Sequence, residues 1–220
     1  MVEYGTISPV IVMQPVLEIY APDGFALWPV AESEPFGYLA LNGDLTSAEV
    51  GTAMMRIAQC NDIDPDPQAG DDRPPRPDEP LASFLHGLLT FEDLFAAGGL
   101  RVTDNTTGVT LMPGCCNGIE EWRDWYAVIE GGGPVGFGHS PDPLAERHGE
   151  TVRLVVDCDK SDSPEIELST TELRRLLEGA EHDLAAFLAL AADWLRTHLP
   201  HQAVPVTDAL ARVLAHPTAA

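Results

Sequence analysis

Two cysteines stand side by side in the stretch PGCCNGIEEWRDWY (113–126), and their chemistry is the most direct that the sequence offers. Asn117 is a favourable helix N-cap, and Glu120 follows three positions later, so that a helix is predicted to begin directly after the cysteines. Unpaired N–H groups and the positive dipole end at a helix start favour a thiolate. One hypothesis is therefore a reactive thiol at Cys115 or Cys116.

Packing competes with this chemical interpretation of the cysteine pair. Acidic residues of the same predicted helix, among them Glu120 and Glu121, disfavour an anion nearby. A disulfide between adjacent residues is strained, and cysteine is among the most often buried residue types. We therefore expect the pair to pack beneath the helix that carries Trp122.

A metal site would need more ligands than this pair, and His139, His148 and Cys158 are the candidates. Two adjacent cysteines rarely share one zinc ion, and the sequence has no CxxC or HxxxH spacing. We therefore expect neither a metal nor another cofactor. A metal, if bound, would use Cys115, Cys116, Cys158 and His139.

The stretch GHSPDPLAERHG (138–149) is predicted to be a loop that places His139 near carboxylates. A histidine beside a carboxylate can serve as a general base, which makes a hydrolase-like enzyme one hypothesis. No serine or cysteine nucleophile stands in a recognisable elbow, and the adjacent Ser140 does not provide triad geometry. The interpretation leans away from an enzyme, and no catalytic residue is assigned.

Helical spacing places four residues of the predicted helix 118–129 on one face, where they are expected to join the core: Ile119, Trp122, Tyr126 and Ile129. Trp125 points away from that face and, if exposed, is the kind of residue that anchors an interface. The candidate binding residues are Cys115, Cys116, Glu120, Glu121, Trp125 and His139.

The charge of the chain limits its partners. Its 220 residues contain 12 Lys and Arg against 35 Asp and Glu, a formal net charge of −23. Such a surface repels nucleic-acid phosphates and anionic lipids, so that we expect no nucleic acid and no membrane as partner. The first twenty residues lack a positive n-region, and no stretch approaches the length of a membrane span. A cytoplasmic location with reduced cysteines is expected.

Composition and periodicity predict three parts: a strand and helix module (1–60), an acidic proline-rich linker or loop (61–80) and a main α+β domain (81–220). In the first part, 9–21 and 25–30 are predicted strands, with Pro15 at an edge or a bulge. Thr46 and Glu49 form a capping-box pattern at the start of a helix 46–60.

The last part is predicted to contain two hairpins and several helices. The hairpins are 100–104 with 108–112 and 150–159 with 164–169, and two helices within 79–99 are expected to end at Gly98-Gly99. Ser169 and Glu172 cap an amphipathic helix of about thirty residues, and a short helix at 206–216 follows. This pattern predicts an α+β fold with helices packed on an antiparallel sheet. The wide apolar stripe of the long helix needs cover from that sheet or from a second copy in a homodimer.

The segments GGLRVTDNTTGVTLMPGCCNGIEEWRDW (98–125) and GHSPDP (138–143) resemble a family of uncharacterised actinobacterial proteins. That family shares a D-x-x-T-G-x-x-L-x-P-G-C-C hairpin-to-helix segment, an acidic helix with tryptophan and a GH-x-P loop. The resemblance covers about residues 90 to 198 and leaves the first sixty outside. It implies no activity and no catalytic residue.

Three functional hypotheses follow. The first is a non-enzymatic acidic binding protein that neutralises a basic protein partner, as immunity proteins do. The second is a thiol- or metal-dependent protein that uses Cys115 and Cys116. The third is a hydrolase-like enzyme that uses the loop around His139.

Overall fold

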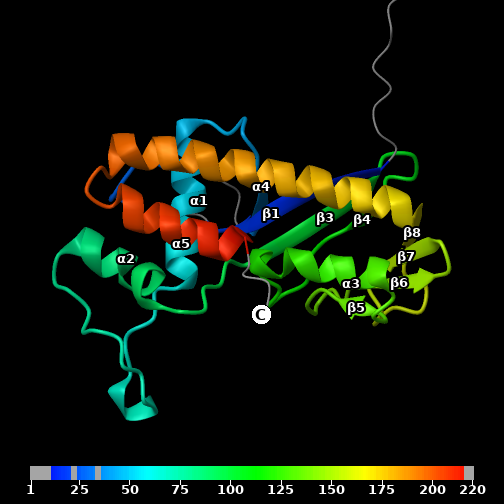
Figure 1. The fold of residues 1–220 in the computed structure, drawn as a ribbon, viewed down its shortest axis with the longest axis horizontal. Helices are drawn as coiled ribbons and strands as arrows, with labels where there is room; N and C mark the ends of the chain where they lie inside the picture. Colours follow the sequence, from blue (N-terminus) through cyan, green and yellow to red (C-terminus); the bar gives the residue numbers. More distant parts are fainter. Residues whose placement is uncertain (1–10, 21–23, 33–35, 216–220) are drawn as a thin grey trace, which may run out of the picture.

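The computed structural model describes residues 11–20, 24–32 and 36–215, which form two antiparallel sheets and the helices that pack on them (Figure 1). The first sheet has the order β2-β1-β3-β4, formed by β1 (Ile11–Ile19), β2 (Gly37–Ala40), β3 (Gly98–Asp104) and β4 (Thr110–Leu111). The second has the order β5-β6-β7-β8, formed by β5 (Val135–Gly136), β6 (Leu144–His148), β7 (Thr151–Val155) and β8 (Glu165–Ser169). The predicted α+β class is confirmed.

The helices in chain order are α1 (Ser47–Cys60), the 3-10 turn η1 (Pro67–Ala69), α2 (Pro80–Thr90), the 3-10 helix η2 (Ile119–Asp124), α3 (Trp125–Glu130), α4 (Thr170–His198) and α5 (Ala203–Ala215). Helix α4 runs along the length of the molecule and contacts strands of both sheets, and α5 folds back beside it (Figure 1). None of the helices in the described part of the chain is both long enough and apolar enough to cross a membrane.

The long helix is confirmed as one helix of 29 residues that continues through Gly179. The Ser169 hydroxyl accepts the N–H of Glu172 at 3.0 Å and caps its start. The apolar stripe is buried along the helix: Leu173, Leu177, Ala180, Leu184, Phe187, Ala191 and Trp194. Its cover comes from α5, α1 and β1 of the same chain. A homodimer through this helix stays a prediction.

Strand β1 lies in the middle of the first sheet, so the prediction that Pro15 occupies an edge or a bulge is wrong. Pro15 pairs with Leu100 of β3, and its carbonyl accepts the N–H of Leu41 at 2.9 Å. In an antiparallel strand the N and C=O of one residue face the same neighbour. The ring nitrogen therefore points past the end of β2, where no donor is needed. Residues 9, 10 and 21 of the predicted strand lie outside the described residues.

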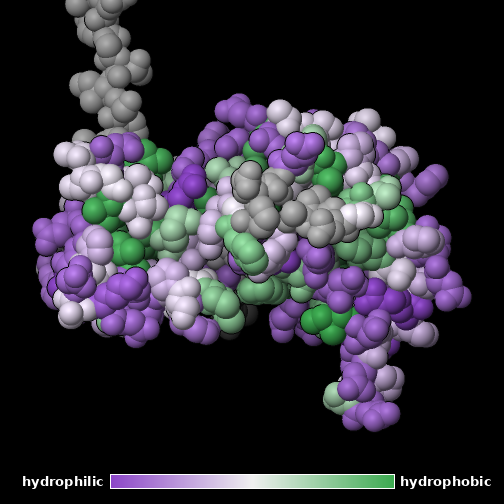
Figure 2. Space-filling model, turned by 180° about the vertical axis from the view of Figure 1, so that it is seen from behind, coloured by the Kyte–Doolittle hydropathy of each residue, from purple (hydrophilic) through white to green (hydrophobic). Residues whose placement is uncertain are grey.

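The segment 61–79 contains η1 and otherwise no regular element, and its tip projects from the rest of the molecule (Figure 1). Hydrophilic residues cover this projection (Figure 2). Arg76 ties the base of the loop together, because its guanidinium pairs with Asp62 and Asp64 and donates to the Ser83 carbonyl at 3.0 Å. Strand β1 from one side of the loop pairs along β3 from the other side. The division into parts 1–60, 61–80 and 81–220 stays a prediction.

Two predicted elements are replaced by tertiary hydrogen bonds. Residues 25–30 are not a strand, because Trp28 turns into the core and donates its indole N–H to the Gly51 carbonyl at 2.8 Å. Residues 91–97 are not a helix, because the Asn61 side chain pairs with both backbone groups of Phe95. Gly98 and Gly99 begin β3 instead of ending a helix.

The prediction that residues 138–149 form a loop is wrong in part, because strand β6 lies within this segment. It pairs with β7 through the turn at Gly149, whose φ of 65° suits glycine. The predicted hairpins of β3 with β4 and of β7 with β8 are confirmed, as is the capping box of Thr46 and Glu49.

We expect Gly179→Ala to stabilise the protein by about 0.5–1 kcal/mol, because alanine restricts the unfolded chain and a Cβ at this position meets nothing within 4 Å. Urea denaturation measures the change. The control is Gly51→Ala in α1, which we expect to destabilise, since its Cβ would lie 2.1 Å from the Pro29 carbonyl oxygen. A destabilising Gly179→Ala would contradict this description of α4.

Candidate functional site

The segment 113–121 lies beside the start of β3 and is held there by backbone and side-chain hydrogen bonds. Gly98 donates its N–H to the Asn117 carbonyl at 3.0 Å, and the Asn117 side chain donates back to the Gly98 carbonyl at 2.8 Å. Ile119 donates its N–H to the Ala96 carbonyl at 2.8 Å. Asn117 is buried and therefore ties two segments together instead of capping a helix.

The helix that follows begins one residue later than predicted and is a 3-10 helix at first. Gly118 is the N-cap of η2, and its N–H donates to the Glu121 carboxylate at 3.4 Å. Regular α-helix starts only at Trp125. The predicted single helix 118–129 is therefore the pair η2 and α3, and the predicted cap by Asn117 with Glu120 is wrong.

A second bridge joins the same segment to the loop before β6. Cys115 donates its N–H to the His139 carbonyl at 2.8 Å, and His139 donates back to the Cys115 carbonyl at 3.2 Å. The backbones come so close that a Cβ on Gly114 would lie 2.4 Å from the Pro141 carbonyl oxygen. The structure therefore brings Cys115, Cys116 and His139 together, and glycine at 114 permits the approach.

Cys115 and Cys116 are both exposed, so the prediction that they pack beneath the Trp122 helix is wrong. The backbone explains this, because Cys115 is held in the bridge to His139 and Cys116 adopts a left-handed φ of 65°. Indole rings fill the space beneath η2 instead. The two sulfur atoms lie 3.5 Å apart.

The surroundings of three cysteines, Cys60, Cys116 and Cys158, disfavour the thiolate form. The hydrogen bond and the charge of Cys115 raise the pKa of the Cys116 thiol above its usual value. Partial loss of solvent contact raises the pKa of Cys158, although its side chain is exposed, with a further contribution from the charge of Asp142. Burial likewise raises the pKa of Cys60. These shifts oppose the expected effect of a helix dipole and weaken the reactive-thiol hypothesis.

The described residues contain no group of three or more His, Cys, Asp or Glu side chains that could hold a metal ion. Cys158 is exposed and donates its N–H to the Asp142 carbonyl at 2.8 Å, so it lies near the loop that carries His139. His139 is exposed. The hydrolase-like hypothesis stays a prediction.

Trp125 is buried, with 1% of its surface exposed, so it is not an interface anchor. Its ring stacks on Phe137 with centroids 4.0 Å apart. The cause is the 3-10 helix, in which three residues make a turn and residues i and i+3 share a face. Trp122 and Trp125 therefore both point into the core, and Trp122 donates its N–H to the Leu214 carbonyl at 2.9 Å. The predicted burial of Trp122, Ile119 and Ile129 is confirmed.

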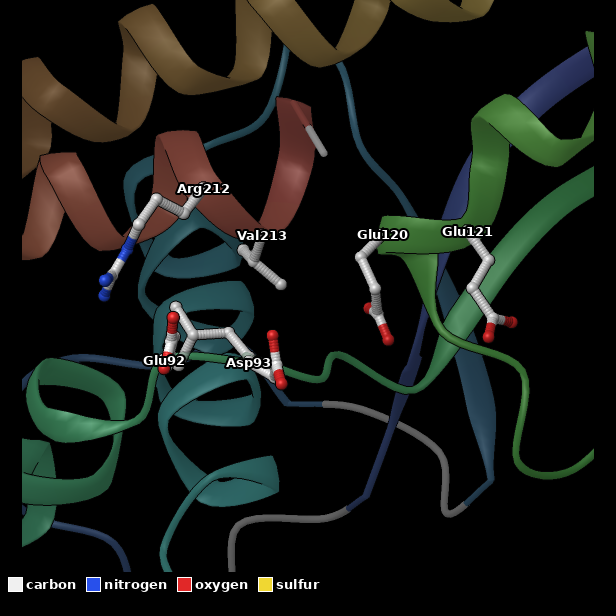
Figure 3. A pocket seen from close by; sticks show the side chains of 7 residues that line it. Glu92, Asp93, Glu120, Glu121, Arg212 and Val213 are labelled. Atoms are coloured by element: carbon white, nitrogen blue, oxygen red, sulfur yellow. The ribbon is translucent and has the colours of Figure 1, made fainter. Parts of the chain in front are cut away.

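Glu120 and Glu121 belong to an acidic pocket, defined here as the cavity of about 300 Å³ lined by Glu92, Asp93, Leu94, Glu120, Glu121, Arg212 and Val213 (Figure 3). Glu92 and Asp93 come from the connection between α2 and β3, and the other two carboxylates come from η2. The Glu120 carboxylate is positioned by the N–H of Ala96, which donates to it at 3.1 Å. Figure 3 shows Arg212 on the side of Glu92, away from Glu120.

Sequence reasoning identified Glu120 and Glu121 but missed Glu92 and Asp93. The missed pair lies in a segment that was predicted to be a helix, where both would have been ordinary solvated residues. Their position beside η2 depends on the bridge between Ala97 and Gly118. Two acidic residues shortly after the end of α2 are a weak signal in the sequence, and the pocket forms only because the bridge between Ala97 and Gly118 brings them beside η2.

Comparison with known proteins gives no match of any kind: neither a family model nor a curated protein nor a solved structure matches this chain. Two places in the structure hold the candidate functional groups. One is the acidic pocket, and the other is the exposed dithiol, defined here as Cys115 and Cys116. The dithiol lies on the segment 113–121, which also supplies Glu120 and Glu121 to the acidic pocket.

We expect Trp125→Ala to destabilise the protein by about 3–5 kcal/mol, because it removes a buried ring that stacks on Phe137. Chemical denaturation provides the measurement. Val204→Ala is the matched control, since this side chain is 72% exposed and its loss should change stability by less than about 0.5 kcal/mol. Equal effects of the two substitutions would refute the buried position of Trp125.

We expect Gly114→Ala to destabilise the protein by about 1–3 kcal/mol, because the added methyl group would force the bridge between Cys115 and His139 apart. Gly132→Ala, in the neighbouring loop, is the control, because its Cβ meets no atom closer than the Ala127 oxygen at 3.3 Å. Thermal or urea unfolding distinguishes the two. If Gly114→Ala were as stable as the control, the close approach at residue 114 would be wrong.

Proposed function

We propose that the protein is a non-enzymatic acidic binding protein whose acidic pocket receives a basic side chain of a protein partner. The observation that carries this proposal is the convergence of four carboxylates from two separate segments on one cavity. Neutralisation of a basic target, as by an immunity-like protein, is the corresponding role, and the cytoplasm is the expected place for it.

Electrostatics support a cationic occupant. Four carboxylates line the cavity together with one guanidinium, that of Arg212, so its lining carries an excess of negative charge that favours a cation. The net charge of −23 adds a long-range attraction for basic partners, which speeds their approach and depends on ionic strength. The cavity volume lies at the lower end of the range for ligand pockets, which suits one side chain better than a large molecule.

Apolar contact is a weaker candidate for recognition. The large hydrophobic side chains that are exposed in the described residues are Phe36, Ile63 and Val204, and they come from three different segments. Single exposed side chains of this kind are ordinary at a protein surface and do not by themselves mark an apolar interface. Figure 2 likewise shows hydrophilic residues over much of one face, with hydrophobic residues in separate places. Charge is therefore the property by which this surface would select a partner.

The test is capture of partners from native lysate at low and high salt, with variants that separate the pocket from the overall charge. The pocket variant is Glu92→Gln, Asp93→Asn, Glu120→Gln and Glu121→Gln. Amides keep the acceptors for the N–H groups of Ala96 and Gly118. The control variant removes four exposed carboxylates elsewhere: Asp72→Asn, Asp162→Asn, Glu167→Gln and Glu178→Gln.

We expect the wild type and the control variant to retain one stoichiometric basic protein at low salt and to release it as salt rises. The pocket variant should lose at least about tenfold in affinity for that protein, because it lacks the carboxylates that pair with the partner. An equal loss in both variants would assign binding to net charge instead of the pocket. A partner retained unchanged at high salt, or no partner, would refute the proposal.

A further inference from the structure

The exposed dithiol is separate from the acidic pocket, and the proposed function does not use it. The two sulfurs lie 3.5 Å apart at the surface. Their positions are set by the bridge between Cys115 and His139 and by the left-handed backbone of Cys116. A disulfide between adjacent residues is strained and easily reduced, so that the pair is more stable as two thiols. Two adjacent thiols that stay reduced can bind a soft ion together.

The distance between the sulfurs indicates which soft ion fits. With a metal–thiolate bond of about 2.3 Å, two sulfurs 3.5 Å apart subtend an angle of about 100° at a shared central atom. This angle is close to that of a pyramidal trivalent centre, and it is far from the straight arrangement of a two-coordinate monovalent ion. Zinc requires four ligands as a rule, and the described residues offer no group of three.

We propose that Cys115 and Cys116 together bind a trivalent thiophilic metalloid of the arsenite class. The two sulfurs occupy two positions of the pyramid, and the third keeps a hydroxide or an organic substituent on the solvent side. With an organic arsenic oxide, two As–S bonds form, and the As–O bond breaks. The two thiol protons leave with that oxygen as one water molecule, and no atom changes oxidation state.

The surroundings favour this reaction in two ways. Both thiols are exposed, so an ion reaches them without opening the fold. The backbone at Cys115 is fixed by reciprocal hydrogen bonds with His139 at 2.8 Å and 3.2 Å. Binding therefore costs little conformational entropy. Chelation by two linked donors exceeds binding by a single thiol by about 10²–10⁴-fold, since the second bond forms within one molecule.

The test uses phenylarsine oxide as the probe and the reduced full-length protein. We expect one arsenic adduct per chain by mass spectrometry and the loss of two of the four free thiols in a colorimetric thiol assay. A small dithiol should remove the adduct, whereas a monothiol at the same concentration should not. Cys115→Ser and Cys116→Gly should each weaken binding at least about 100-fold. Glycine at 116 accepts the left-handed φ, and circular dichroism checks that both variants are folded.

Cys158→Ser is the matched control, because Cys158 is also exposed but has no adjacent cysteine. It should bind the probe as the wild type does. The proposal is overturned if phenylarsine oxide consumes no thiol pair, or if Cys158→Ser weakens binding as much as Cys115→Ser. It is also overturned if zinc alone, at equal concentration, protects both thiols more strongly than the arsenical does.

Discussion

Burial of the apolar stripe of α4 is the interaction on which the rest of the structure depends. Both sheets are small, and β4 and β5 have two residues each, so neither sheet buries enough apolar surface to be stable alone. Helix α4 contacts β1 of the first sheet and both β7 and β8 of the second. Each large side chain that it buries contributes about 1.5–3 kcal/mol. Loss of this helix would therefore separate the two sheets and the segments held between them.

The segment 113–121 is one of those segments, and it carries the dithiol and two carboxylates of the acidic pocket. On one side it pairs with the start of β3, and on the other it pairs with the loop of His139. Gly98 makes the first approach possible, because a Cβ there would lie 2.1 Å from the Val16 carbonyl oxygen. The first bridge places η2 beside Glu92 and Asp93, and the second exposes the two cysteines. One short stretch is thus fixed by two long-range pairings, and each pairing creates one site.

Local signals predicted much of the fold, because they describe interactions between near neighbours in the chain. The long helix followed from its apolar period, the hairpins from alternation and turn residues, and the cap of α1 from Thr46 and Glu49. Local signals do not predict interactions between residues that are far apart in the chain. The Asn61 side chain pairs with the backbone of Phe95, so residues 91–97 do not form a helix. The 3-10 geometry of η2 places Trp125 in the core. Cys116 is exposed although cysteine is usually buried, because its backbone has a left-handed φ. The amino-acid composition does not predict such a backbone conformation.

The net charge of the chain affects both sites, because it attracts cations and repels anions. A surface of −23 lowers the local concentration of anions, so that phosphate-bearing ligands are disfavoured at both places. A basic side chain is attracted to the acidic pocket by the same field. An uncharged hydroxide of a trivalent metalloid is neither attracted nor repelled, and at the thiols two of its hydroxyl groups leave as water with the two thiol protons. The field therefore supports the proposed cationic partner of the pocket, whereas the affinity of sulfur for a soft ion supports the proposed occupant of the dithiol. The two kinds of selectivity, one of long range and one of contact, meet at the segment 113–121 because its backbone is fixed on one side against the start of β3 and on the other against the loop of His139.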